Sequence, residues 1–181
     1  VVGPVYAQLP GEVPEIVADL AAGPKPLVYF AVGSSGNRDL VLDVLRGLGR
    51  ADCQVLAPVR SHLHQEDLET LPLNIHVTDW IPAHQLGEAV DLAITHGGEG
   101  TVQTSCVQGW PFIGIPLQLE QRCVAFGNVR LVSSKKASRT GWAKLVVRQL
   151  ADRMMWDAAD RMAELCDGLD GPGRCADVML M

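Results

Sequence analysis

Short, continuous apolar runs alternate along the chain with longer stretches whose apolar positions recur every three or four residues. The first run, Leu27–Val32, has the length of a strand and no charged position, which is typical of a strand buried on both faces. A helix is predicted after it, from the N-cap Asn37 to about Leu48, because its apolar residues keep helical spacing. Further runs predict buried strands at residues 54–57, 74–78, 91–95 and 112–115. This alternation predicts an α/β fold with a doubly wound parallel sheet, Rossmann-like in its winding.

Helices are predicted in the intervals between these strands and in the C-terminal part of the chain. The intervals favour helices from about Pro82, Glu99 and Leu119, whereas residues 60–70 are expected to form a loop. The C-terminal part contains amphipathic segments at 142–150 and 157–167, and Gly171-Pro172-Gly173 interrupts the pattern before a last short helix to Met181.

Residues 1–26 differ from the rest of the chain, because proline and glycine punctuate them and leave room for only one short helix, at 14–22. We interpret residues 1–26 as an interdomain linker and docking segment, and residues 27–181 as one domain. The chain begins with Val1 and not with methionine, so we expect it to be an excised piece of a longer protein.

Composition narrows the class of protein. The chain has 181 residues and a net charge of −6, which disfavours binding to nucleic acid or to a membrane surface. The one basic cluster, Lys135-Lys136 with Arg130 and Arg139, is expected to be a solvated loop. The five cysteines form no C-x-x-C pair, and most lie in apolar patterns, so we expect reduced core cysteines in a cytoplasmic protein. No apolar run is long enough to span a membrane, and no signal peptide is recognisable.

The strongest candidate for chemistry is T-H-G-G-E-G-T, residues 95–101, between a predicted strand and a predicted helix. Such a turn directs backbone N–H groups and the positive end of the helix dipole at one point. Its glycines, Gly97, Gly98 and Gly100, allow a ligand close to the backbone, and Thr101 adds a hydroxyl. We interpret it as a phosphate cradle with the imidazole of His96 beside it; the alternative is a glycine-rich turn with a surface histidine.

Other candidate residues follow the remaining predicted strands. In a doubly wound sheet, ligands bind outside the carboxyl ends of the strands. Those ends carry residues 33–36, 60–64, 80–82, 96–101 and 116–121, of which two are glycine-rich. Simpler interpretations stay open: Trp80 as a packing residue, Glu120 as an acid at a helix start, and Ser34-Ser35 as turn residues. A metal site at His62, His64 and His76 is disfavoured because no fourth ligand is suitably spaced.

These motifs, taken in order, resemble the nucleotide-sugar signature of the large family of GT-B glycosyltransferases, which includes bacterial macrolide and antibiotic glycosyltransferases. The matching residues are Asp79-Trp80-Ile81-Pro82, residues 95–101, Gly109-x-Pro111, Ile115-Pro116 and Glu120-Gln121. The loop Gly33-Ser34-Ser35 and the lead-in also resemble that family's first C-domain loop and interdomain linker. The resemblance implies the donor-binding, C-terminal half of a GT-B architecture.

The resemblance also implies roles for these residues. Trp80 would stack on the pyrimidine base of the donor, with the backbone at Ile81 bonding the base edge. The diphosphate would be bound by His96, by the turn and helix start, and by the first loop, that is by Gly97, Gly98, Gly100, Thr101, Gly33, Ser34 and Ser35. Glu120 and Gln121 would bind hydroxyls of the sugar. No cofactor and no metal are implied, the nucleotide sugar being a substrate.

Two departures from the family pattern bear on the donor. Ala83 stands where many members have glutamine, and Thr104 stands where plant members have a glutamate that binds the ribose hydroxyls. Loss of that carboxylate favours a dTDP-sugar, which has no 2′-hydroxyl, over a UDP-sugar.

The expected function is therefore nucleotide-sugar binding in an inverting glycosyltransferase that transfers a hexose to a hydroxyl of a small molecule, and the expected acceptor is a natural product. No catalytic residue is assigned to this chain, because the resemblance places the general base in an N-terminal domain; alone it is expected to be inactive. Two other hypotheses remain: a stand-alone donor subunit that pairs with an acceptor subunit, and a non-enzymatic nucleotide-binding regulator.

Overall fold

The computed structural model describes residues 3–5, 8, 10–118, 121 and 128–180. Its centre is a six-stranded parallel sheet with the strand order β3-β2-β1-β4-β5-β6. The strands are β1 (Leu27–Ala31), β2 (Gln54–Ala57), β3 (Ile75–Val77), β4 (Leu92–Thr95), β5 (Phe112–Gly114) and β6 (Val129–Leu131). The predicted doubly wound parallel sheet is thereby confirmed, with a sixth strand added.

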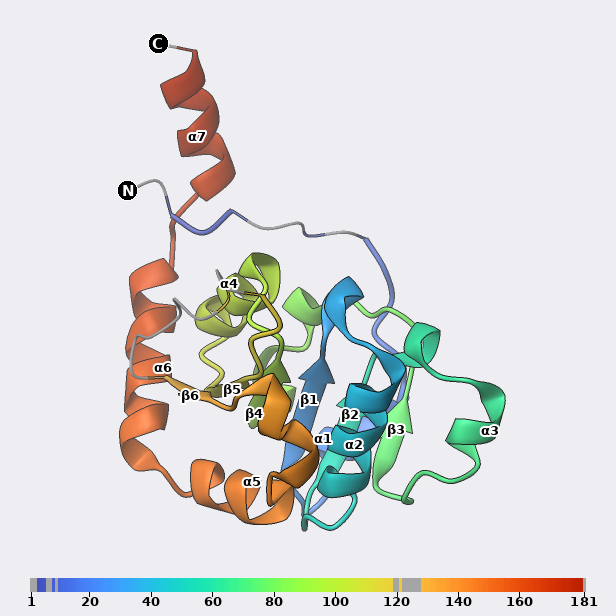
Figure 1. The fold of residues 1–181 in the computed structure, drawn as a ribbon. Helices are drawn as coiled ribbons and strands as arrows, with labels where there is room; N and C mark the ends of the chain where they lie inside the picture. The colour runs from blue at the N-terminus through green and yellow to red at the C-terminus, as the bar shows by residue number, and fades with distance from the viewer. Residues whose placement is uncertain (1–2, 6–7, 9, 119–120, 122–127, 181) are drawn as a thin grey trace.

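The strand order reverses direction between β1 and β4, which are neighbours although β2 and β3 separate them in sequence. From β1 the chain winds outward through β2 and β3, then returns to β4 and winds outward the other way. The connections that follow β1 and β4 therefore diverge, and they leave a crevice at the carboxyl ends of these two strands. In Figure 1 the strands point towards the top of the view, so their carboxyl ends lie on that side of the sheet.

Helices cover both faces of the sheet. They are α1 (Ile16–Ala21), α2 (Arg38–Leu48), α3 (Gln65–Leu68), α4 (Glu99–Val107), α5 (Trp142–Leu150), α6 (Arg153–Cys166) and α7 (Gly171–Met179). Helices α2 and α5 contact each other on one face, and α4 and α6 contact each other on the other face (Figure 1).

Alternating side chains of β1 build a separate core on each face. Val28 and Phe30 pack with α2 and with Trp142 of α5, whereas Leu27 and Tyr29 pack with α1, α4 and Trp110. Every residue of β1 is buried, as its uninterrupted apolar run predicts. Two cores on one central strand give the crevice above it a rigid floor.

Several predicted element boundaries are wrong. A helix does not start at Pro82; two 3₁₀ turns, Ala83–Gln85 and Gly87–Ala89, occupy this interval. Gly87, the first residue of the second turn, has a φ of +52°, outside helical geometry. The expected loop at 60–70 contains the short helix α3. The helix predicted from Leu119 lies outside the described residues.

Capping explains the boundaries near the C-terminus. Helix α6 begins at Arg153, earlier than predicted, because the Asp152 carboxylate accepts a hydrogen bond from the backbone N–H of Met155. Helix α7 includes the Gly-Pro-Gly segment that the sequence pattern places before it. Asp170 caps α7 through the N–H of Gly173, and Pro172 lies in the first turn, where its missing N–H loses no bond.

The prediction that the cysteines lie in the core is confirmed for two of them. Cys53 and Cys106 are buried, and burial raises the pKa of the Cys53 thiol to about 11. Cys166 and Cys175 are only half-buried on α6 and α7, so the expectation is wrong for them. Cys123 lies outside the described residues.

The N-terminal segment contacts the C-terminal part of the chain at Gly171. Helix α7 projects from the body of the molecule, and the N-terminal segment passes beside its base (Figure 1). There Gly171 lies against the backbone of Pro4. Nearer the sheet, α1 buries Val17 and Leu20 in the second core, which attaches residues 16–21 to the domain. Among the described helices, none combines the length and apolar character that crossing a membrane requires.

Candidate functional site

The two glycine-rich segments lie side by side at the crevice. Ala31, the last residue of β1, pairs with Thr95, the last residue of β4. The chain therefore leaves both strands at the same level. After β1 it forms a 3₁₀ turn, Gly33–Ser35, and after β4 it passes through His96, Gly97 and Gly98 into α4. The fold thus brings together the two segments that the sequence predicted to share a phosphate.

The imidazole of His96 is held between two glycines, one from each segment. A Cβ on Gly33 would lie 2.8 Å from Cε1 of His96, and a Cβ on Gly98 would overlap Nε2. Gly33 also has a φ of +54°, a conformation that residues with a side chain rarely adopt. Both positions therefore require glycine, because any larger residue would displace the ring.

Burial and an unpaired nitrogen distinguish His96 from a surface histidine. Its side chain is 8% exposed, and its Nδ1 has no hydrogen-bond partner among the described residues. Burial lowers the pKa of the imidazole, and the backbone of Ala31 opposes part of that shift. Burial thus favours the neutral form of the ring, and its buried Nδ1 is a polar atom that is costly to leave without a partner. The alternative of a surface histidine is wrong for this position.

The start of α4 presents unpaired backbone donors. Gly98 is the N-cap residue, and no side chain caps the helix. The first N–H groups of a helix have no partner within it, and they lie at the positive end of its dipole. Gly100, in this first turn, has open space where a Cβ would project. These are the requirements of an anion-binding helix terminus.

A chain of hydrogen bonds fixes this turn, and Thr95 is its centre. The N–H of Gly97 donates to Oγ1 of Thr95 over 3.0 Å, and that hydroxyl donates to Oγ1 of Thr101, also over 3.0 Å. Thr101 in turn donates to the carbonyl of Gly98 over 2.8 Å. The Thr101 hydroxyl thus holds the turn together, and its direct contact with a phosphate stays a prediction. The sequence analysis gave Thr95 no role of this kind.

The loop Gly33-Ser34-Ser35 is followed by an ion pair that fixes the chain after it. Arg38, the first residue of α2, donates to both carboxylate oxygens of Asp67, over 2.8 Å and 2.6 Å. This bidentate pair joins the segment after Ser35 to α3, and the Arg38 guanidinium lowers the pKa of the Asp67 carboxyl. Ser34 is exposed and Ser35 half-buried, so Ser34 is open to a ligand. No sequence motif indicated the Arg38–Asp67 pair, since 29 residues separate its members.

Trp80 lies beyond the end of β3 and is 58% exposed, which is unusual for so large an apolar side chain. A Cβ on Gly11 would lie 2.9 Å from the Trp80 ring, so the lead-in passes directly against it. The neighbouring Ile81 side chain is buried in the second core, which leaves only its backbone for a ligand. The alternative of Trp80 as a packing residue stays open, because Trp80 and Pro82 both lie against Gly11.

The loop after β5 lies against the turn. A Cβ on Gly97, whose φ is +81°, would lie 3.0 Å from the carbonyl oxygen of Gln121. The Gln121 side chain is buried, and its Oε1 accepts bonds from the N–H groups of Leu117 and Gln118. Its amide therefore supports this loop, and contact with a sugar stays a prediction. Glu120 lies outside the described residues.

The positions that depart from the family pattern are also defined. Thr104 is buried, and its hydroxyl donates to the carbonyl of Gly100 over 2.8 Å, so it is turned back on its own helix. Ala83 lies in the 3₁₀ turn after Pro82. In the part of the chain that the structure describes, no three His, Cys, Asp or Glu side chains lie close enough together to hold a metal ion.

Comparison with known proteins gives one consistent result. Residues 42–164 match the family described as erythromycin biosynthesis protein CIII-like, C-terminal domain. A PGL/p-HBAD biosynthesis glycosyltransferase of Mycobacterium tuberculosis is 28% identical over 145 residues, which cover 77% of this chain and 33% of that protein. The chain thus spans about a third of the length of this relative.

Solved structures agree in fold. The glycosyltransferase SnogD from Streptomyces nogalater superposes with a TM-score of 0.78 at 25% identity, over 98% of this chain and 49% of SnogD. The glycosyltransferase VinC in complex with dTDP superposes with a TM-score of 0.73 at 22% identity, over 90% of this chain and 42% of VinC. The sheet with its flanking helices is that of the C-terminal domain of a GT-B glycosyltransferase, and the chain belongs to the erythromycin biosynthesis protein CIII-like C-terminal domain family.

Proposed function

We propose that the chain binds the nucleotide-sugar donor of an inverting glycosyltransferase, with the diphosphate in the crevice between β1 and β4. The observation that carries this proposal is the buried His96 ring, held between Gly33 and Gly98 at the uncapped start of α4. Backbone N–H groups, the helix dipole and the His96 imidazole then meet at one place. Two negatively charged phosphate groups match this set of donors better than a neutral ligand does.

The same crevice orders the rest of the donor. Trp80 offers an exposed aromatic face to a pyrimidine base, and Ser34 offers a hydroxyl to the phosphates from the first loop. Glu120 and Gln121, at the end of the loop after β5, are proposed to bind sugar hydroxyls. In this arrangement, the turn at 96–101 stabilises the departing nucleoside diphosphate as the sugar–phosphate bond breaks.

A dTDP-sugar is the proposed donor. A ribose 2′-hydroxyl would need an acceptor on α4, and the short side chain of Thr104 already donates to the backbone of its own helix. Deoxyribose lacks this hydroxyl and makes no such demand. The complex of VinC with dTDP supports the proposal, because that structure has the same fold.

The acceptor is proposed to be a hydroxyl group of a small natural product, as the name of the matching erythromycin biosynthesis family suggests. In an inverting transfer, a general base removes the proton of this hydroxyl while the diphosphate leaves. That base is proposed to come from outside the matched domain, so that the chain alone binds the donor but does not transfer the sugar.

Calorimetric titration with dTDP, UDP and inorganic phosphate tests this function. We expect saturable binding of dTDP, weaker binding of UDP, and at least about a tenfold loss, or 1.4 kcal/mol, for His96→Ala and Trp80→Ala. Phosphate that competes as well as dTDP, together with an unchanged Trp80→Ala variant, would contradict the proposal.

A further inference from the structure

A second surface, remote from the crevice, concentrates positive charge. Residues 128–151 contain six of the fifteen lysines and arginines and none of the twenty-one acidic residues. This segment thus carries +6 in a chain whose net charge is −6, so the remaining residues carry −12. Its six cations are Arg130, Lys135, Lys136, Arg139, Lys144 and Arg148. We call the surface that they form the basic face.

The fold gathers these cations around a groove. A hollow of about 570 Å³ lies between the edge strand β6 and helix α5, with the 3₁₀ segment Ser134–Arg139 at its end. Four cations line it, Arg130, Lys136, Lys144 and Arg148, and no acidic side chain does. The sequence predicted a solvated basic loop around Lys135 and Lys136; the structure adds two cations of α5, one helical turn apart on one side of that helix.

The cations of the basic face form no ion pair with the described residues. Within the described residues, the ion pairs involve Lys25 and Arg38, and none of the six. Lys144 and Arg148, at i and i+4, repel each other and destabilise α5 slightly. A smaller hollow of about 240 Å³ shares Arg130 and Arg148; its one acid, Asp152, is engaged in capping α6. An external anion would relieve this repulsion.

Exposed apolar side chains lie on β6 and α5 and at the start of the neighbouring helix α6. Leu131 of β6 is 41% exposed, Val147 of α5 is 56% exposed, and Met154, which lines the smaller hollow, is 80% exposed. Cations combined with exposed aliphatic side chains are typical of proteins that lie on a membrane surface, where the cations meet headgroup phosphates and the aliphatic groups reach the acyl boundary. Among the described residues, no aromatic side chain lines either hollow, which disfavours single-stranded nucleic acid.

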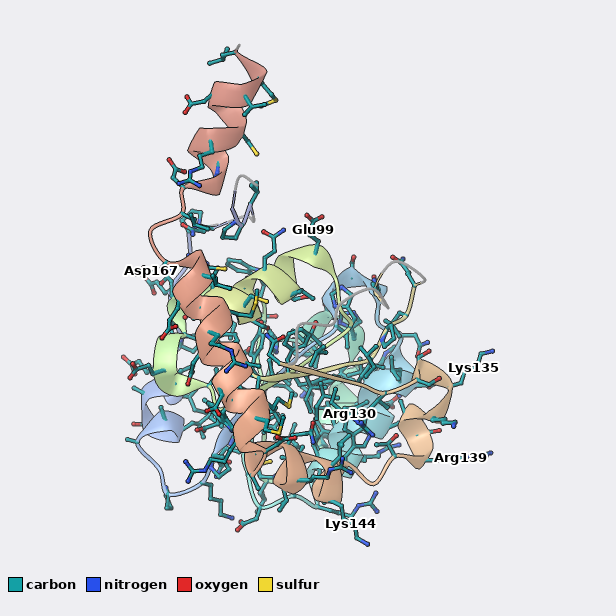
Figure 2. All side chains as sticks on the ribbon, turned by 90° about the vertical axis from the view of Figure 1, so that its left-hand side faces the viewer. Glu99, Arg130, Lys135, Arg139, Lys144 and Asp167 are labelled. Carbon is teal, nitrogen blue, oxygen red and sulfur yellow. The ribbon has the colours of Figure 1, made fainter. Side chains whose placement is uncertain are left out.

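Figure 2 shows how the basic face lies relative to the crevice. Arg130, Lys135, Arg139 and Lys144 lie in the lower half of this view, whereas Glu99, at the start of α4, and Asp167 lie in the upper half, below α7. A partner on the basic face therefore leaves the crevice open.

We infer that the basic face docks the protein on an anionic lipid bilayer, with headgroup phosphates in the groove between β6 and α5. The inference is independent of the proposed donor binding, because it uses none of the residues of the crevice. It replaces the expectation that the negative net charge disfavours membrane surfaces, since local charge governs contacts shorter than the Debye length of about 8 Å.

The test is co-sedimentation of the 181-residue chain with vesicles of phosphatidylcholine, alone or with phosphatidylglycerol. Each cation near an anionic surface contributes about 1 kcal/mol, or a factor of about five. We expect binding only to the phosphatidylglycerol vesicles, lost as salt rises. The double variant Lys136→Glu/Lys144→Glu should bind at least about twentyfold more weakly.

The control is Arg161→Glu/Arg174→Glu, at exposed positions of α6 and α7. It has the same net charge as Lys136→Glu/Lys144→Glu but leaves the basic face intact. It should bind within about twofold of the parent, since distant charges are screened. The milder variant Lys136→Gln/Lys144→Gln removes the same two charges without reversing them. It separates the loss of charge from any folding defect that the charge reversal causes, and it should also lose binding. Leu131→Ser/Val147→Ser should bind severalfold more weakly to vesicles.

Three outcomes would overturn the inference. The first is equal binding to both kinds of vesicle, and the second is an equal loss in the Arg161/Arg174 control. The third is full competition by millimolar inorganic phosphate or by polyglutamate, which would assign the groove to a small anion or to an acidic protein.

Discussion

The proposed donor site has two ends, one proposed for the phosphates and one for the base, and they are built in different ways. At the phosphate end, His96 is 8% exposed, and two glycines, a chain of hydroxyl bonds and the start of α4 fix its surroundings. At the base end, Trp80 is 58% exposed and rests against Gly11 of the lead-in. The phosphate end is thus a rigid part of the sheet edge, whereas the base end is a single surface side chain. We infer that damage to the first harms fold and binding together, and that damage to the second harms binding alone.

The largest effect is expected for Gly98→Ala. A Cβ there would overlap Nε2 of His96, so the ring and the start of α4 must separate. Loss of one or two charge-assisted hydrogen bonds corresponds to about a hundredfold weaker dTDP binding, measured by calorimetry.

The matched control is Gly100→Ala, two residues further on, where a Cβ meets nothing within 4 Å. Alanine is the better helix former, so thermal stability should be equal or slightly higher, and dTDP should still bind. Equal losses in both variants would show that the Gly98 effect does not come from the His96 contact.

Trp80→Ala tests the end of the site that is proposed to bind the base. Stacking on an aromatic ring contributes about 1–3 kcal/mol, and an exposed ring lies at the lower end, so dTDP should bind about tenfold more weakly. Pyrophosphate binding and the melting temperature should not change. A large drop in melting temperature would show instead that Trp80 is structural.

Thr95→Val tests the hydrogen-bond chain with little change of shape. It leaves the buried N–H of Gly97 unpaired, which should lower the free energy of unfolding by about 1–3 kcal/mol, measured with denaturant. Binding of dTDP should weaken severalfold because the turn loosens. Thr95→Ser keeps the hydroxyl and should retain most of both properties; failure of serine to do so would assign the effect to the lost methyl group.

The smallest effect is expected for His96→Gln, on the pH dependence of the unfolding free energy. The folded-state pKa of His96 is lowered by burial, so protons bind the unfolded chain more readily, and stability present above pH 6.5 is lost as the pH falls below it. His76, whose pKa burial also lowers, acts in the same direction. His96→Gln should therefore reduce, without abolishing, the fall in unfolding free energy between pH 7 and pH 5. An unchanged slope would mean that His96 is not buried in solution.

The sequence predicted the sheet and its core well, because each central strand is an apolar run long enough to identify. It missed β6, whose residues Val129, Arg130 and Leu131 alternate and lie at the exposed edge. It placed a helix at Pro82, where the structure has two 3₁₀ turns and Gly87 has a φ of +52°. The carbonyls of His84 and Gly87 accept hydrogen bonds from the side chains of Gln108 and Trp110, contacts that local spacing does not reveal.

The candidate site was predictable to the extent that it depends on local backbone. The strand, glycine turn and helix start at 95–101 are contiguous, so their pattern is visible in the sequence. The contacts between distant segments were not: Gly33 against His96, Gly11 against Trp80, and Arg38 with Asp67. Each of these depends on the winding of the chain, which spacing alone does not specify.

The central claim is that the diphosphate binds at the β1/β4 crevice, and amide chemical shifts of the 181-residue chain during titration with dTDP test it most directly. The account predicts the largest shifts at Ser34, Ser35 and the first turn of α4, residues 98–101, with residues 130–148 little changed. The largest shifts at residues 130–148, with those of the α4 turn unmoved, would contradict it and would assign nucleotide binding to the basic face.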